Sequence, residues 1–213
     1  MITEGVAELI GVIIGDGHIY RKNRKYQIGI VGNSKTDLGY FEKLKKLISA
    51  EWNKEVKIKP VHGTNAIRIV FDSKEICNFL INDMNIYHGR GKCQKVKIPK
   101  EIYENWDLAK HTVRGIFDTD GSIFVSKKPG IEKYPCMEIT TTSKNLVYQL
   151  KSLLNKNRFR VALRIEKRKN PNPNALPSYR LALNGKENLK KWIEEISFTN
   201  PYKLNRALNY LNN

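Results

Sequence analysis

Leu9-Ile-Gly-Val-Ile-Ile-Gly-Asp-Gly17 is an apolar run that ends in an Asp-Gly pair, and the pattern returns at Val113-Arg-Gly-Ile-Phe-Asp-Thr-Asp-Gly121. The acids of the two pairs, Asp16 and Asp120, lie roughly a hundred residues apart, whereas solenoid repeats have periods of about 20–50 residues. This spacing indicates duplication of a whole domain. The sequence therefore predicts two similar halves, each of which contributes one carboxylate to a two-fold site.

The residues after each motif repeat in the same order. Alternating strand-like stretches lead to Ser34-Lys35 in the first half and Ser143-Lys144 in the second; a helical pattern and two further alternating runs follow. We therefore expect an α+β fold of two pseudosymmetric αββαββα halves, with the motif helices packed at their interface. The predicted boundaries are 1–88 for the first half, 89–109 for a linker and lead-in helix, and 110–213 for the second half.

The chain is strongly basic. It carries 38 Lys and Arg against 21 Asp and Glu, a formal net charge of +17, while 40% of its residues are hydrophobic. A charge excess in both halves favours a polyanionic partner, with nucleic acid ahead of an anionic membrane. No apolar run approaches the roughly 18 residues of a membrane span, and the first residues lack the basic start of a signal peptide. We expect an intracellular protein that is cytoplasmic or nucleoid-associated, or organellar if the host is eukaryotic.

Alternation along the predicted strands separates apolar from cationic side chains, as where Val56 and Ile58 alternate with Lys57 and Lys59. Antiparallel sheets with helices on the apolar face leave the other face open, and two such sheets would form a saddle suited to duplex DNA. Glu166 is the acidic exception. The residues predicted to face DNA are Tyr20, Lys22, Gln27, Lys57, Lys59, Arg68, Arg164, Arg168 and Arg180.

The motifs themselves predict two closely packed helices, each with an aspartate at its C-terminal end. Gly11 and Gly15 fall four apart on one helix face, as do Gly115 and Thr119, and small residues let two helices approach closely. We expect Gly17 and Gly121 to end the helices in the left-handed conformation, which places both acids at the negative helix ends. Two carboxylates meeting there are favourable chiefly if divalent cations neutralise them. The three scattered cysteines show no zinc-site spacing, so a hard metal with oxygen ligands is predicted.

Two such motifs at domain spacing, each followed by the same strand pattern and Ser-Lys, resemble the signatures of the single-chain, intron-encoded LAGLIDADG homing endonucleases over nearly the whole chain. The resemblance implies a monomer that makes a site-specific double-strand break with short 3′ overhangs in a long DNA target. It implies Mg²⁺ as cofactor, with Mn²⁺ able to substitute and Ca²⁺ supporting binding without cleavage. Asp16 and Asp120 match the catalytic metal-binding acids. Gly15 and Thr119 match the positions whose main-chain carbonyls complete the coordination.

The residues that assist the metals are less defined. Some relatives place a Gln-Lys pair before the first long surface helix, and that pair is missing in both halves here. Asn33 and Thr142 are candidates for ordering water, and Arg68 and Arg180 for stabilising phosphate. Asp118 has Ile14 as its counterpart, and we expect it to point away from the metals in a structural role.

Two alternative functions remain open. The basic surface would also suit an RNA maturase that binds intron RNA, or a DNA-binding protein that has lost cleavage; the two retained acids favour the nuclease. An intein origin is disfavoured, because the chain has no Cys or Ser at its start and ends in Leu211-Asn-Asn. The stretch 170–177, rich in Pro and Asn, predicts a hairpin tip that either reaches along DNA or has no role.

Overall fold

The duplicated architecture predicted from the motifs is confirmed by a computed structural model, which describes residues 1–166 and 176–212. The hairpin tip predicted at 170–177 falls largely outside these residues, and so does Arg168. The elements of the first half are α1 (Glu4–Ile14), β1 (Gly17–Lys22), β2 (Lys25–Asn33), α2 (Leu38–Trp52), β3 (Ile58–Pro60), β4 (Ala66–Asp72) and α3 (Lys74–Asn78), which the π-helical turn η1 (Phe79–Asp83) continues.

The second half repeats this order. Its elements are α6 (Trp106–Thr119), β5 (Ser122–Lys128), β6 (Ile131–Thr141), α7 (Lys144–Lys156), β7 (Val161–Glu166), β8 (Ser178–Asn184) and α8 (Lys186–Glu195). Two short helices, α4 (Lys92–Lys95) and α5 (Lys100–Tyr103), connect the halves, and α9 (Pro201–Asn212) follows the second. Within the described ranges, no helix combines the length and the apolarity that crossing a bilayer requires.

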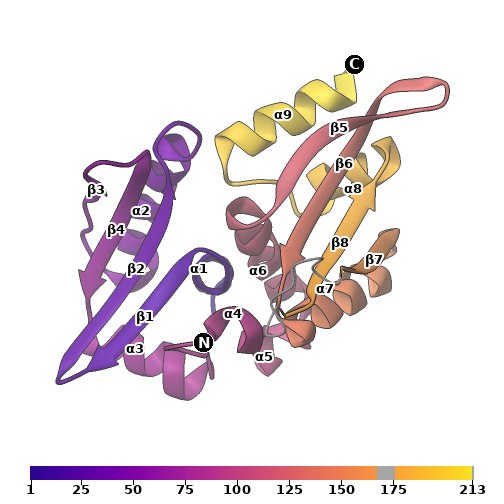
Figure 1. The fold of residues 1–213 in the computed structure, drawn as a ribbon. Helices are drawn as coiled ribbons and strands as arrows, with labels where there is room; N and C mark the ends of the chain where they lie inside the picture. The colour runs from indigo at the N-terminus through magenta and orange to yellow at the C-terminus, as the bar shows by residue number, and fades with distance from the viewer. Residues whose placement is uncertain (167–175, 213) are drawn as a thin grey trace.

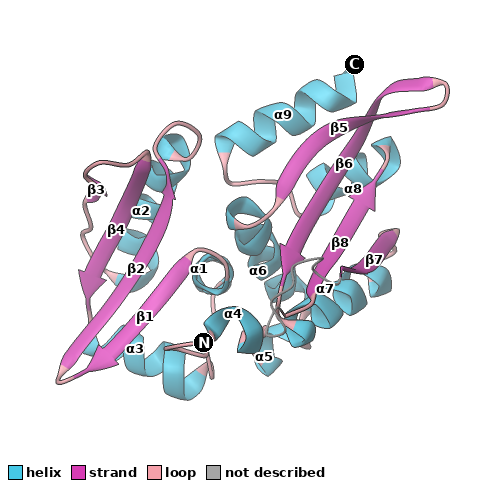
Figure 2. Ribbon diagram, in the orientation of Figure 1, coloured by secondary structure: helices cyan, strands magenta, loops and turns pink. Residues whose placement is uncertain are grey.

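Each half contains one antiparallel four-stranded sheet, with strand order β1-β2-β4-β3 in the first and β5-β6-β8-β7 in the second. The two sheets stand on either side of α1 and α6, which lie together in the middle of the molecule (Figure 1). The long helices α2 and α7 lie behind their own sheets (Figure 2), so one face of each sheet is left open.

The core is continuous through α1. Leu9, Ile10 and Ile13 are fully buried because α1 is enclosed by its own half on one side and by α6 on the other. In the second half, Trp192 is buried, and the centroid of its ring lies 4.6 Å from the centroid of the Phe117 ring. Packing of this kind fixes where the last turns of α1 and α6 lie, and those turns carry the repeated Asp-Gly pairs.

Candidate active site

The motif helices α1 and α6 meet with their backbones nearly in contact. A Cβ at Gly11 would lie 2.2 Å from the carbonyl oxygen of Thr112, and one at Gly115 would lie 2.4 Å from that of Glu8. Thr112 Oγ1 donates a hydrogen bond to the carbonyl of Ala7 across the same interface, at 2.7 Å. Small residues are therefore required at these positions by the approach of two main chains.

The last turns of the two helices also meet. A Cβ at Gly15 would lie 2.1 Å from Thr119 Oγ1 and 3.5 Å from the carboxyl carbon of Asp120. The structure thus brings together the four residues expected to form the metal site, with Asp16 hydrogen-bonded to Asp120.

The predicted left-handed caps are wrong. Neither Gly17 nor Gly121 has a positive φ. A Cβ at Gly17 would instead lie 2.5 Å from Ile13 Cα, and one at Gly121 would lie 2.5 Å from the carbonyl oxygen of Phe117. Glycine is required because the chain turns back against the last turn of its own helix as it enters the strand.

Burial and proximity raise the pKa of both acids. The pKa of Asp16 rises to about 6, first because burial disfavours the charged carboxylate and then because Asp120 is close. Burial likewise raises the pKa of Asp120, while Lys92, Lys203 and the hydrogen bond with Asp16 act in the opposite direction. Without a cation, a proton shared by the pair reduces the repulsion between the two carboxylates.

Two lysines that the sequence interpretation missed complete this arrangement. Lys92, on α4, donates from Nζ to the carbonyls of Ile13 (2.5 Å), Gly15 (2.9 Å) and Gly17 (2.5 Å) at the end of α1. Burial lowers the pKa of Lys92 to about 8, although both acids oppose this shift.

Lys203, on α9, occupies the corresponding place at the end of α6. It donates to the carbonyls of Phe117 (2.7 Å), Asp118 (2.7 Å) and Thr119 (3.1 Å), and burial lowers its pKa as well. Each helix end therefore holds one ammonium group; of the two lysines, Lys92 lowers the pKa of Asp120 more and Lys203 lowers that of Asp16 more. The two lysines stand at different distances along the chain from the helix ends that they contact, so the duplication alone did not reveal them.

The donor set fits a hard divalent cation. No cluster of three or more His, Cys, Asp and Glu side chains that could hold a metal occurs in the described part of the chain, so main-chain carbonyls must contribute. The Gly15 and Thr119 carbonyls already receive a cation, the ammonium of Lys92 or Lys203. Carboxylate and carbonyl oxygens are the ligands that Mg²⁺ and Ca²⁺ prefer.

The two candidates for ordering water lie in different settings. Asn33 Oδ1 accepts from the Lys35 backbone, and the Asn33 N–H donates to Asp37. The Thr142 hydroxyl donates to the carbonyl of Cys93 at 2.9 Å and lines a hollow of about 320 Å³ together with Asp120 and Lys92. Thr142 therefore lies beside the acid pair, but its hydroxyl hydrogen is directed to the segment that carries Lys92.

The two candidate arginines lie on the open sheet faces. Arg68 pairs in register with Lys59 on the neighbouring strand. Both line a hollow to which neither Asp16 nor Asp120 contributes. Arg180 lies between two glutamates, with Nε 3.1 Å from Glu166 and Nη1 3.8 Å from Glu138. To contact a DNA phosphate, the Arg180 guanidinium would therefore have to break its ion pairs with these glutamates or bind the phosphate and the glutamates together.

Several of the residues predicted to face DNA lie on the open face of the first sheet. Tyr20, Lys22, Gln27, Lys59 and Arg68 are placed on it, although Asp72 is there as well and accepts from Gln27 at 3.4 Å. Lys57 lies just before β3 and lines a hollow against α2. On the second sheet, Arg164 lies opposite Arg180, whose two glutamate partners make the face mixed in charge.

Asp118 is buried and is turned towards the segment before α9. Its Oδ2 accepts from the Thr199 backbone N–H at 2.8 Å, which attaches α6 to the segment before α9. Burial raises the pKa of this carboxyl to about 7. The structural role expected for Asp118 agrees with this placement.

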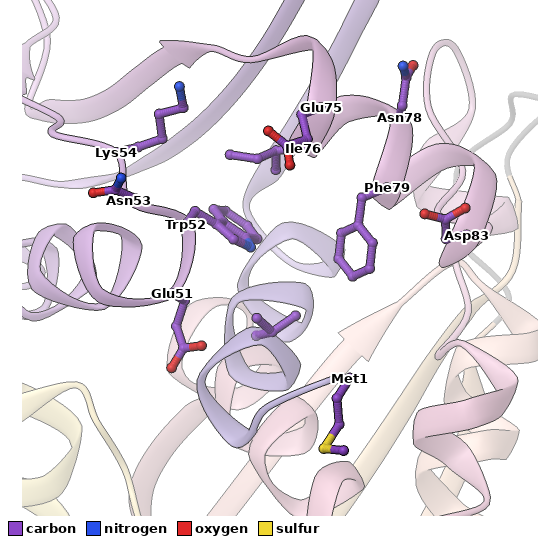
Figure 3. A pocket seen from close by; sticks show the side chains of 11 residues that line it. Met1, Glu51, Trp52, Asn53, Lys54, Glu75, Ile76, Asn78, Phe79 and Asp83 are labelled. Carbon is purple, nitrogen blue, oxygen red and sulfur yellow. The ribbon is translucent and has the colours of Figure 1, made fainter.

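A further hollow of about 820 Å³ lies on the helical side of the first half (Figure 3). Its lining includes Trp52, Phe79, Glu51, Glu75 and Asp83, and neither aspartate of the motifs takes part. We therefore place the candidate active site at the helix ends and not in this hollow.

The class of the protein follows from comparison of both halves with known domains. Residues 107–197 match the family described as LAGLIDADG-like domain, and residues 6–103 match the WhiA LAGLIDADG-like domain. Each half of the chain is thus similar to a LAGLIDADG-like domain.

Among individual proteins, the chain is similar to two replication factor C small subunits. The one from Methanocaldococcus jannaschii is 30% identical over 207 residues, and the one from Thermococcus kodakarensis is 26% identical over 204 residues. These alignments cover 97% and 95% of this chain but only 10% and 21% of the relatives, which are much longer.

Solved structures share the whole fold. The homing endonuclease I-DmoI in complex with DNA and Ca superposes with a TM-score of 0.64 at 19% identity, covering 98% of both chains. Full-length DUF199/WhiA from Thermatoga maritima gives a TM-score of 0.60 at 16% identity, covering 97% of this chain and 60% of that one. I-DmoI structures with DNA and Mn, and with target DNA and Mg, are also similar. At these identities the likeness concerns the fold.

Proposed function

We propose that this chain is a site-specific DNA endonuclease of the homing type, intron-encoded and monomeric, which makes a double-strand break with short 3′ overhangs. The observation that carries the proposal is the pairing of Asp16 and Asp120 at the ends of two helices in backbone contact, with Lys92 and Lys203 beside them. A fold alone does not require buried acids and buried ammonium groups at one point, because each costs desolvation free energy. A metal-assisted reaction at a phosphodiester would use both, because the acids can hold the metal and the ammonium groups can stabilise developing negative charge.

Asp16 and Asp120, with the carbonyls of Gly15 and Thr119, would hold Mg²⁺, and Mn²⁺ could replace it. The bound metal supplies an activated water and stabilises the leaving oxygen. Asp16 and Asp120 would each contribute a carboxylate ligand, one acid for cleavage of each strand. Lys92 and Lys203 bring positive charge to the two half-sites, and their buried amines suit stabilisation of developing negative charge or delivery of a proton.

DNA binding would use the open sheet faces. Lysine and arginine side chains there neutralise phosphates, and Gln27 and Arg164 are of the types that read base edges in the major groove. Two other functions fit the same fold and charge: a DNA-binding protein that does not cut, and a maturase that binds intron RNA.

The test is selection from a randomised duplex library, once with Mg²⁺ and once with Ca²⁺, followed by sequencing of the molecules that are cut or retained. We expect one long site that is cut with 3′ overhangs in Mg²⁺ and retained uncut in Ca²⁺. Retention of a site without cutting in Mg²⁺ or Mn²⁺ would identify a binding protein instead. Retention of structured RNA but not of duplex DNA would support the maturase.

A further inference from the structure

Each active-site lysine lies on a segment that contacts the other half of the molecule. Lys92 serves the end of α1 in the first half, whereas the α4 segment on which it lies is hydrogen-bonded to the beginning of α7 in the second half. Lys203 serves the end of α6 in the second half, whereas the start of its helix, α9, is hydrogen-bonded to the beginning of α2 in the first half.

The contacts of the α4 segment come from the beginning of α7 and from within that helix. Thr142 Oγ1 donates to the carbonyl of Cys93 (2.9 Å), and the fully buried Ser143 Oγ donates to that of Val96 (2.6 Å). Further along α7, Gln149 both donates to and accepts from the backbone of Ile98. A four-residue helix has little stability of its own, so these contacts decide where α4 and Lys92 lie.

The contacts of α9 converge on Asn200, which is fully buried. Its Oδ1 accepts from the backbone N–H groups of Tyr202 (3.0 Å) and Lys203 (3.4 Å), so it caps α9. Its Nδ2 donates to Asp37 Oδ1 (3.2 Å) and lies 3.4 Å from the carbonyl of Asp118. The residue that fixes the start of α9 is therefore attached to both halves at once.

The two arrangements are related by the duplication. Asp37 is the N-cap residue of α2 and Ser143 is the N-cap residue of α7, and these are equivalent helices of the two halves. The chemistry has diverged: a carboxylate accepts from an asparagine in one case, and neighbouring hydroxyls donate to carbonyls in the other.

We propose that each half-site lysine is positioned by the opposite half: Lys92 by Thr142 and Ser143, and Lys203 by Asp37 through Asn200. Thr142, Ser143, Asp37 and Asn200 are thus positioning residues for cleavage of one strand each. This inference rests on the proposed endonuclease function. It makes the two half-sites depend on correct docking of the halves, because each lysine reaches the carbonyls of its helix end only when the other half is in place.

The test is strand-resolved cleavage of the selected target, with a different label on each strand. Lys92→Met and Lys203→Met first identify the strand that each lysine serves. We then expect Thr142→Val, which loses the donor at nearly constant volume, to slow the Lys92 strand by about ten- to a hundredfold and to leave the other strand unchanged. Asp37→Ala should slow the Lys203 strand in the same way.

Conservative variants serve as matched controls. Thr142→Ser keeps the hydroxyl, so it should restore most of the lost rate. Asp37→Asn keeps one acceptor oxygen for two donors, Asn200 Nδ2 and the Asn33 N–H, so it should restore only part of it. A general loss of protein stability would slow cleavage of both strands, and the conservative variants would not restore the cleavage of one strand selectively. Equal slowing of both strands by Thr142→Val, or slowing of the strand assigned to Lys203, would overturn the proposal.

A second measurement needs neither metal nor DNA. Acylation of lysines by an amine-reactive ester, followed by mass spectrometry, reports how accessible each amine is. Thr142→Val should raise acylation of Lys92 several-fold but not that of Lys203, and Asp37→Ala should do the reverse. If Thr142 only ordered water, the reactivity of Lys92 would not change, which would contradict the proposal. If the wild-type protein failed to cut DNA, the proposed endonuclease function would be refuted. The acylation measurement would still test whether Thr142 and Asp37 position the two lysines.

Discussion

Asp16 and Asp120 lie where their charges cost free energy. Both are largely buried, both follow a helix C-terminus, and each is the other's neighbour, so burial and repulsion raise the pKa of Asp16 to about 6. Groups that destabilise the folded chain are retained when function requires them. The structural cost of this pair is thus part of the argument for its role.

Neutral substitution should separate stability from activity at these positions. We expect Asp16→Asn and Asp120→Asn to reduce cleavage by at least about a hundredfold, because a ligand charge is lost from the metal site. In metal-free buffer both variants should unfold at higher temperature than the wild type, since repulsion is removed. Gel shift in Ca²⁺ should show nearly unchanged DNA binding. Full double-strand cleavage by either variant would contradict the assignment.

Asp118 predicts a pH dependence of stability. Its pKa is raised from 3.8 to about 7 by burial, so between these values the folded protein keeps a proton that the unfolded chain releases. The stability that this proton contributes is present below about pH 4 and is lost as the pH rises towards about 7.

Asp118→Asn should remove this dependence, because the amide is neutral and its oxygen still accepts from Thr199. The free energy of unfolding of the variant, relative to the wild type, should rise from pH 4 to pH 7 by an amount on the order of a few kcal/mol. Urea denaturation of the metal-free proteins across this range measures it. A difference that stays constant with pH would show that Asp118 is ionised in both states.

At the scale of elements, α1 and α6 are the decisive pair. Their approach is set by main-chain atoms, so the helix ends and the acids cannot move independently. The apolar periodicity predicted both helices and their small-residue faces. It could not show that Gly17 and Gly121 are needed where the chain folds back against the last turn of the preceding helix, because that contact depends on the path of the following strand.

Gly115→Ala should destabilise the protein by about 1–3 kcal/mol, since the added Cβ would lie 2.4 Å from the carbonyl oxygen of Glu8 and two helices would have to separate. Gly39→Ala, in the first turn of α2, is the matched control. There the Cβ would meet only Pro201 Cγ at 3.5 Å, so we expect a gain of up to about 1 kcal/mol from helix propensity. Chemical denaturation of both variants measures the two effects, and equal changes would contradict the close packing of α1 and α6.

At the scale of the whole molecule, the two halves are alike in fold and different in surface. The first sheet presents Lys22, Lys59 and Arg68 on its open face, whereas Glu138 and Glu166 surround Arg180 on the second. Among the residues that the structure describes, the two open faces therefore differ in how their cations are paired. We expect Lys22, Lys59 and Arg68 to contact phosphates in the first half.

Salt should weaken binding steeply. If six to ten phosphates are neutralised, affinity should fall by about 10³–10⁵ between 50 and 200 mM salt, because counterions are released. Lys59→Gln, on the open face, should reduce the slope of log affinity against log salt by about 1. Lys45→Gln, on α2 behind the sheet, should leave it unchanged. Fluorescence anisotropy in Ca²⁺ measures both, and equal slopes for the two variants would exclude the open face as the binding surface.

The sequence by itself determined the duplication, the order of elements in each half and the two acids. These are local properties: periodicity reflects which face of an element is buried, and the Asp-Gly pairs are adjacent to the helices that place them. Only the tertiary structure identified Lys92 and Lys203, the Glu138 and Glu166 partners of Arg180, and the contacts of Asp37 and Thr142 across the halves. Lys92, Asp37 and Thr142 meet their partners only when the two halves dock, and Arg180 meets its glutamates only when β6, β7 and β8 pair, so no spacing in the sequence could indicate them.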